Sequence, residues 1–208
     1  MNKFYLSLLF SLLTATSFSQ IDSAAYKILN AVSSKMKKST GVSAGFTMVS
    51  KGRTGNLNSN NTGKILIKGN KYYIKQGSNE IFNDGIKNWN YNGNDEVTVT
   101  DAESEDQPLS PQRLISGEYD KDFVYKIISS KGSYHEIQLI PFDKRKNFQK
   151  INLFVDKVKM IISKATVLDK SNNTFQLVLN NINTKANLTE KAFVFDKTKY
   201  HKNIEVIE

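Results

Sequence analysis

Residues 64–91 read KILIKGNKYYIKQGSNEIFNDGIKNWNY, and this stretch decides the fold class. Bulky apolar residues alternate with polar ones, which is the period of a β-strand with one buried face. Gly69-Asn70 and Asp84-Gly85 interrupt the alternation with residues typical of tight turns. The stretch therefore predicts consecutive antiparallel strands at 64–68, 71–76, 80–83 and 86–91.

The alternation continues on both sides of this stretch. A strand is expected at 44–48, and the polar, Gly- and Asn-rich residues 51–62 are expected to form a loop. Further strands are expected around 97–99 and at 123–129, 134–140, 148–155, 160–168 and 174–182, with a short final pair at 193–195 and 204–207. About ten strands exceed what a strongly twisted open sheet carries without curling. We therefore expect a mainly β fold: a single, strongly curved, unclosed antiparallel β-barrel.

Two segments have the features of helices that could cover the concave side of such a sheet. Residues 21–38 place apolar side chains at intervals of three and four, and Gly41 ends the pattern. Ser110-Pro111 has the form of a helix start, which predicts a short helical insertion within 108–116. These two helices are the expected lid.

The first nineteen residues have the features of a secretory signal peptide. Lys3 provides the basic start, Phe4 to Leu13 form a short apolar run, and Ser17-Phe18-Ser19 offers a cleavage site. We expect residues 20–208 to form one exported domain. The chain contains no cysteine, so the lipid attachment of a bacterial lipoprotein is not expected, and the mature protein is expected to be soluble.

The net charge is +9, and it falls to +8 when Lys3 leaves with the signal peptide. Such a charge favours anionic partners, of which nucleic acid is not expected for an exported protein. The lysines are spread along the chain, which is typical of solvated surfaces.

The sequence offers little for catalysis. It has two histidines, neither at metal-ligand spacing, and it lacks a Gly-rich phosphate loop and a nucleophile elbow. The acidic residues in 101–106 lack the spacing of a calcium loop. We expect no enzyme activity, no cofactor and no metal site.

The informative residues are apolar and lie at alternate positions. Ile65 and Ile67 share one face of their strand, and Trp89 and Tyr91 share a face of theirs. Bulky pairs of this kind fit one lined face of a sheet. Periodicity leaves open whether that face is a filled core or the wall of a lipid cavity.

Several segments resemble a known family in collinear order. They are Ala44-Gly45-Phe46-Thr47, the strands at 63–68 and 71–74, Asp84-Gly85-Ile86-Lys87-Asn88-Trp89-Asn90-Tyr91, the helical insertion at Pro108 to Ile115, Leu139-Ile140-Pro141 and Phe193-Val194-Phe195. Together these segments resemble the outer-membrane lipoprotein carrier family (LolA-like) over nearly the whole mature chain.

The resemblance implies a fold and a function. The fold is an unclosed, curved antiparallel sheet with a helical lid over an apolar cavity. The function is a periplasmic carrier that accepts acylated lipoproteins from an inner-membrane ABC exporter and passes them to an outer-membrane acceptor, acting as a monomer. The expected cavity lining is Ile65, Ile67, Tyr72, Ile74, Ile81, Trp89, Tyr91, Val97, Val99, Leu114, Leu139 and Leu153, and the expected lid contacts are Ile28, Leu29, Val32, Leu109 and Ile115.

One segment departs from the family pattern. An Arg-Pro element, whose arginine latches the lid, is replaced here by Lys68-Gly69-Asn70. Lys68 could substitute only as a point donor, because an ammonium lacks the fork geometry of a guanidinium. The departure therefore implies a looser lid or a different trigger for opening, and Lys68 is the candidate for a substitute latch.

Three alternatives stay open at this point. The same fold could carry or sense another envelope lipid. A hydrolase of envelope material would use Asp84, His135 or Glu136 as its acid–base group. A glycan-binding module would need Trp89 and neighbouring tyrosines as an exposed stacking platform, whereas their alternation favours an inner face.

Overall fold

The computed structural model describes residues 22–102, 111–117, 119, 122–201 and 203–208. The expected signal peptide at 1–19 and the expected lid residue Leu109 lie outside these ranges. In the part of the chain that is described, no helix has the length and apolar character needed to span a membrane.

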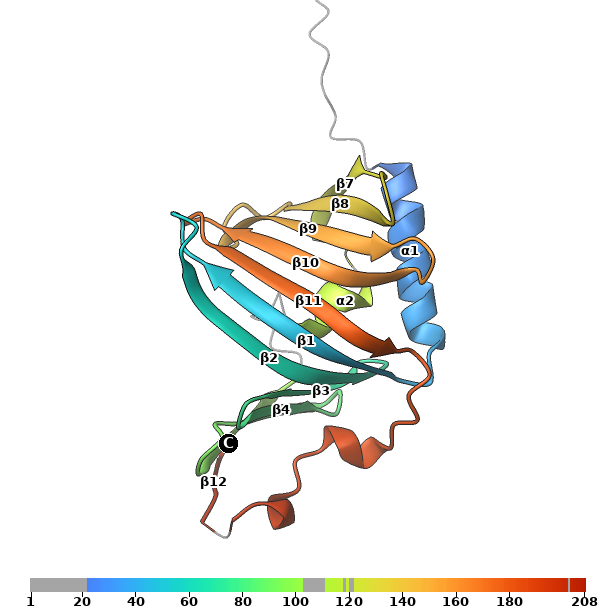
Figure 1. The fold of residues 1–208 in the computed structure, drawn as a ribbon. Coiled ribbons are helices and arrows are strands. Elements are labelled where there is room, and N and C mark those ends of the chain that lie inside the picture. The colour runs from blue at the N-terminus through green and yellow to red at the C-terminus, as the bar shows by residue number, and fades with distance from the viewer. Residues whose placement is uncertain (1–21, 103–110, 118, 120–121, 202) are drawn as a thin grey trace, which may run out of the picture.

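One sheet of twelve strands dominates the fold, in the order β12-β6-β5-β4-β3-β2-β1-β11-β10-β9-β8-β7 (Figure 1). Adjacent strands in the sheet are antiparallel, apart from β12 and β6, which are parallel. The sheet curls strongly but leaves β7 and β12 as edges, so the barrel is unclosed. The strands are β1 Val42–Lys51, β2 Leu57–Lys68, β3 Lys71–Gln76, β4 Asn79–Asn83, β5 Lys87–Tyr91, β6 Glu96–Asp101, β7 Phe123–Ser129, β8 Tyr134–Pro141, β9 Phe148–Asp156, β10 Ile161–Asp169, β11 Thr174–Asn183 and β12 Glu205–Ile207.

Two α-helices pack against the sheet, as the sequence predicts. Helix α1 (Ser23–Lys38) contacts β7 and β10, and helix α2 (Pro111–Ser116) contacts β10 and α1. Asp22 caps the start of α1, and Ser39 ends it by donating its backbone N–H and its hydroxyl to the Met36 carbonyl. The expected fold class, a mainly β unclosed barrel with helical cover, is confirmed.

The main hydrophobic core lies between the two helices and the concave face of the sheet. Ala25, Leu29 and Val32 of α1 are fully buried there, together with Ile115 of α2. Their partners come from both halves of the barrel, because β1 to β3 and β7 to β11 all contribute buried residues to the same cluster.

Two expectations about local structure were wrong. Residues 57–62 belong to β2, not to a loop, because their backbone pairs with β1 although their side chains are largely exposed. A strand exposed on both faces has no apolar alternation for sequence reasoning to find. The strand expected at 193–195 is not present, because residues 190–193 form a short 3-10 helix. The other strand of the expected final pair is β12, and it pairs with β6.

Candidate functional site

The concave interior gathers many of the residues expected to line a cavity. Ile65, Ile67, Tyr72, Ile74, Leu139 and Leu153 are buried in the main core with Leu29, Val32 and Ile115, and Ile28 and Ile81 pack against it. The side chain of Leu114 lies outside the described part of the structure. In this structure the side chains of α1 and α2 occupy the space that a ligand would need.

Strand register explains why these residues share a face. Directly opposed residues of an antiparallel pair lie on the same side of the sheet. Ala44 opposes Ile65, Ile65 opposes Ile74, and Ile74 opposes Ile81. One apolar row therefore crosses four strands on the concave side.

The expected inner position of Trp89, Tyr91, Val97 and Val99 was wrong. Trp89 opposes Phe82 and Val99, whereas the inner row of Ile81 continues to Asn90 and Thr98. A one-residue change in phase moves a whole set of side chains to the other face. These four residues therefore lie on the outer face, in a separate hydrophobic cluster with Ile204.

The inner face of β5 and β6, and of β4 at Asn83, is polar instead. Asn88 Oδ1 accepts hydrogen bonds from the Tyr72 hydroxyl at 3.1 Å and from Asn83 Nδ2 at 2.6 Å. Its Nδ2 donates to the Asp101 carbonyl at 3.3 Å. All three side chains are buried, so the concave surface changes from apolar at Ile81 in β4 to amide-lined at Asn83 and in β5.

The outer cluster is covered by the C-terminal strap, which we define as residues 184–201 together with β12. Figure 1 shows this segment running from β11 past β3 and β4 to the edge at β12. The Tyr200 ring lies 4.9 Å from Tyr91 and 4.8 Å from Phe195, measured between centroids. Phe195 in turn lies 5.9 Å from Phe82. The strap thus buries the apolar side of β4 to β6 from outside.

A buried carboxylate fastens the strap to the sheet. Glu80 accepts hydrogen bonds from the Lys75 ammonium and the Tyr200 hydroxyl. Burial alone would raise the pKa of Glu80, but the hydrogen bonds from Lys75 and Tyr200 outweigh it, so the pKa is lowered. Burial and the neighbouring Glu80 carboxylate raise the pKa of Tyr73 to about 12. The cluster is therefore an ionised carboxylate held by donors.

The Lys68 ammonium contacts the strap, in contrast to the expected latch on the helical lid. It donates to the Leu188 carbonyl at 3.0 Å and to Glu190 at 2.8 Å, and Lys71 binds the same carboxylate at 2.6 Å. These hydrogen bonds hold the pKa of Glu190 at about 2. Lys68 follows Ile67 in β2, so its side chain leaves the sheet on the outer face, away from α1.

A hollow of about 240 Å³ lies where the helices meet the turn between β2 and β3. It is lined by Ser33, Met36, Lys37, Ile67, Gly69, Asn70 and Ser116. Ile67 belongs to the main core and Met36 packs against it, so this hollow reaches the apolar interior at the rim of the barrel.

The residues expected for a hydrolase or for a glycan-binding module do not form a site. Asp84 accepts from the backbone of Ile86 and Lys87 within its own turn, at 2.8 Å each. His135 Nδ1 lies 2.8 Å from the exposed Ser130 hydroxyl, and Glu136 accepts from Asn152 at 2.8 Å. Trp89 and Tyr91 are packed with the strap, which removes the exposed platform that a glycan-binding module would need.

Part of the inner surface was not predicted from the sequence. Val42, Ala44, Phe46, Leu177 and Leu179 are buried on the concave side. The alternation of Val42, Ala44 and Phe46 was the available signal. No comparable signal identified Asn88, because asparagine at a strand position normally indicates a solvated face.

The family model described as outer membrane lipoprotein carrier protein LolA matches residues 37–196. The chain belongs to this family. The match covers β1 to β11 and the first part of the strap. By its description it is a family of lipoprotein carriers. No curated protein sequence matches the chain at a significant level.

Solved structures are similar to this chain at low sequence identity. An uncharacterized conserved protein from Thermus thermophilus is 14% identical with a TM-score of 0.59, covering 88% of this chain and 98% of that one. MucB is 14% identical with a TM-score of 0.51, covering 89% of this chain and 66% of that one. A LolA superfamily protein from Nitrosomonas europaea is 14% identical with a TM-score of 0.47, covering 82% of this chain and 97% of that one.

Proposed function

We propose that this LolA-family chain is a periplasmic carrier that shields the acyl chains of lipoproteins between α1, α2 and the concave face of the sheet. It would accept them from an inner-membrane ABC exporter and pass them to an outer-membrane acceptor. One observation supports this above others: a continuous apolar surface on both halves of the barrel is covered by two short helices and not by a second sheet.

The energetics of loading favour the replacement of helix side chains by an acyl chain. Acyl chains cannot cross water unshielded, because burying one chain of about fifteen methylenes is worth about 12 kcal/mol at roughly 0.8 kcal/mol each. Moving α1 away would expose Leu29 and Val32, each worth about 1.5–3 kcal/mol when buried. An incoming acyl chain can replace those contacts, so the free energy gained by burying it offsets the cost of moving α1.

The hollow beside Met36 and Ile67 is the entrance that this proposal requires. It lies on the rim between α1, α2 and the β2–β3 turn, and it leads to core side chains without crossing a β-strand. α1 is tied to the sheet by polar contacts near its two ends, from Asp22 to Ile127 and from Lys35 to the Lys159 carbonyl. A few hydrogen bonds of this kind, exposed or only partly buried, can be broken during loading.

The amide-lined wall suggests how a cargo would be oriented. Acyl chains would lie against the apolar rows that include Ile65 and Ile74. The ester and amide groups at the lipid–peptide junction would face Asn90 and Thr98 on the inner side of β5 and β6. Tyrosine hydroxyls such as that of Tyr72 add polar points within the lining, which limits the grip and assists release.

The proposal is tested by locking the entrance. The chain has no cysteine, so Ser33→Cys with Asn70→Cys introduces the only two thiols, on opposite sides of the hollow. A short bismaleimide should then abolish binding of a synthetic diacylated lipopeptide, as measured by native mass spectrometry. The single-cysteine variants treated alike should still bind. Unchanged loading of the bridged protein would contradict the proposed entrance and lid.

A further inference from the structure

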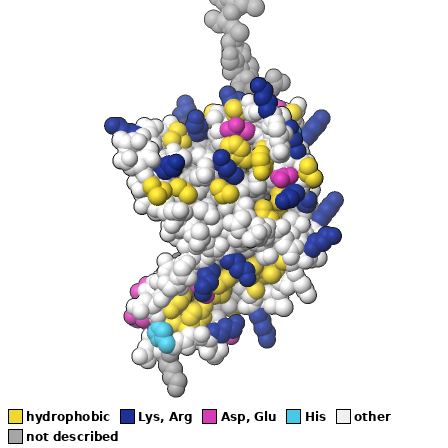
Figure 2. All heavy atoms as spheres, viewed as in Figure 1, with side chains coloured by type: hydrophobic (Ala, Val, Ile, Leu, Met, Phe, Trp, Pro, Cys, Tyr) yellow, Lys and Arg dark blue, Asp and Glu magenta, His cyan; other side chains and the backbone are white. Residues whose placement is uncertain are grey.

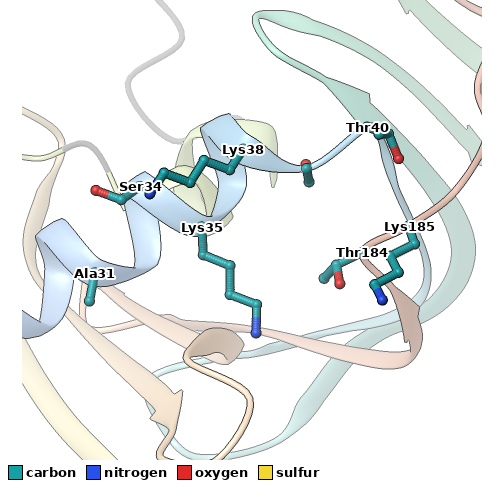
Figure 3. A pocket seen from close by; sticks show the side chains of 8 residues that line it. Ala31, Ser34, Lys35, Lys38, Thr40, Thr184 and Lys185 are labelled. Carbon is teal, nitrogen blue, oxygen red and sulfur yellow. The ribbon is translucent and has the colours of Figure 1, made fainter.

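A second hollow, of about 590 Å³, lies beside the C-terminal half of α1 (Figure 3). Its volume falls within the range of roughly 300–1,000 Å³ that is common for small-molecule sites. It is bounded by the C-terminal half of α1, the link to β1 and the residues just after β11. The lining residues are Ala31, Ser34, Lys35, Lys38, Ser39, Thr40, Thr184 and Lys185.

The lining is cationic without a compensating acid. It contains three lysines and no Asp or Glu. Among the ion pairs of the described residues, none involves Lys35, Lys38 or Lys185. Lysines and arginines are also spread over the face drawn in Figure 2. Charges gathered at one hollow repel each other unless an anion joins them.

The helix dipole accounts for only two of the three lysines at this hollow. Lys35 and Lys38 lie in the last turns of α1, where a cation suits the partial negative charge of the helix end. Lys185 belongs to a separate segment, which is fixed against Gly41 by the Ala186 N–H bond to the Gly41 carbonyl at 3.0 Å. Two distant segments therefore bring cations to the same hollow.

The orientation of the side chains leaves donors for a ligand. In Figure 3, Lys35 extends from the helix towards the segment that carries Thr184 and Lys185. Its ammonium donates to the Lys159 carbonyl, which uses one of its three donors. The hydroxyls of Ser34, Thr40 and Thr184 add neutral donors around the same space.

We propose that this hollow binds a phosphate group. Lysine binds phosphate as a point charge, and hydroxyl donors complete the shell of a group that only accepts hydrogen bonds. The phosphate could be that of an anionic phospholipid headgroup or of a soluble phosphate ester. The proposal is independent of the acyl cargo, because the hollow lies outside the apolar interior and shares no lining residue with the entrance.

The test compares two triple variants of equal charge. Lys35→Gln, Lys38→Gln and Lys185→Gln remove the cations of the hollow, whereas Lys51→Gln, Lys131→Gln and Lys144→Gln remove exposed lysines elsewhere. Residues 20–208 are floated with vesicles of phosphatidylcholine, with and without about one third phosphatidylglycerol. Glycerol 3-phosphate and inorganic phosphate are titrated separately by NMR. Lysines near an anionic surface contribute about 1 kcal/mol each, so a loss of at least about tenfold is expected for the first triple variant only.

The outcomes separate the two sources of phosphate. Binding to phosphatidylglycerol vesicles that is lost in the first variant and kept in the second assigns the site to a lipid headgroup. Saturable binding of glycerol 3-phosphate that is lost in the same way, without vesicle binding, assigns it to a soluble ester. Thr184→Val should weaken either one, because it removes a donor without changing charge. Equal losses in both triple variants, or no phosphate binding at all, would overturn the proposal.

Discussion

Asp22 joins the first turn of α1 to Ile127 in the edge strand β7. One carboxylate oxygen accepts the N–H groups of Ala24 and Ala25, at 2.9 and 3.1 Å, and the other accepts the Ile127 N–H at 3.0 Å. A single side chain thus caps the covering helix and satisfies an unpaired donor of the sheet edge, 105 residues away. The start of α1 is positioned by this carboxylate.

Two substitutions of Asp22 separate its two roles. Asn keeps an oxygen for the helix cap but turns an NH₂ group towards Ile127, whereas Ala removes both acceptors. We expect hydrogen exchange at the Ile127 amide to quicken in both variants, and exchange in the first turn of α1 to quicken only in Asp22→Ala. The Ala variant should lose about 1–2 kcal/mol in urea unfolding. An Asn variant that still protects Ile127 would show that the bond to β7 is unimportant.

The same carboxylate makes the anchoring of α1 sensitive to acid. The hydrogen bond from Ile127, followed by that from Ala25, lowers the pKa of Asp22 below its ordinary 3.8. A lowered pKa contributes stability that is complete above the unfolded value and is lost as the pH falls through the folded value. The stability difference between the wild type and Asp22→Asn should therefore be constant from about pH 7 to 5 and shrink towards pH 3. Urea titrations across that range measure it; a difference that grows on acidification would contradict the assignment.

Gly117 controls the contact between the two helices. Its φ is +77°, and a Cβ there would lie 3.0 Å from the Ser33 nitrogen and from Val32 Cγ1. Gly132 has a φ of +64° but open space around it. Gly132→Ala should cost about 1 kcal/mol from backbone strain alone, and Gly117→Ala clearly more, because α1 must also move. Thermal unfolding of both variants measures the difference, and equal costs would show that the packing is not tight.

Lys68 is expected to hold the strap and not the lid. Lys68→Ala removes the donor to the Leu188 carbonyl and to Glu190. Hydrogen exchange should quicken in residues 188–193 and stay unchanged in α1. Lys64→Ala, an exposed lysine on the same face of β2, is the matched control and should change neither. Faster exchange in α1 upon Lys68→Ala would restore the latch hypothesis.

Trp89 should report on the strap and be insensitive to cargo. It packs with Val97, Val99 and Ile204, and Ile204 is only 3% exposed. Ile204→Ala should loosen β12, cost about 2 kcal/mol and shift the Trp89 emission to the red. Ile207→Ala, in β12 itself but exposed, should leave the spectrum unchanged. A blue shift of Trp89 upon adding lipopeptide would indicate that cargo binds to the outer face.

The strands and helices could be predicted because their signals are local. Alternation in 64–76 and the turn at Asp84-Gly85 depend on near neighbours in the chain, and so does the period of α1. The facing of β5 and β6 could not be predicted, because their phase relative to Ile81 depends on the register between β4 and β5, which pairs Ile81 with Asn90 and not with Trp89.

The strap could not be predicted for a different reason. Residues 184–204 have no regular period, and the strap is held by long-range contacts such as those of Lys68 with Glu190 and of Glu80 with Tyr200. Such contacts join residues about 120 positions apart, and no local pattern encodes them. The lid role considered for Lys68 came from the family resemblance, whereas its partners in the structure are the Leu188 carbonyl and Glu190.

The most direct test of the carrier proposal is to map where an acyl chain lies. A diacylated lipopeptide with a photoreactive diazirine near the end of one chain is bound, irradiated and located by peptide mass spectrometry. We expect labels on the concave rows of β1 to β3 and β9 to β11 and on the inner side of α1, and none on Trp89 or the strap. Labelling confined to the outer face, or absent altogether, would contradict the carrier account.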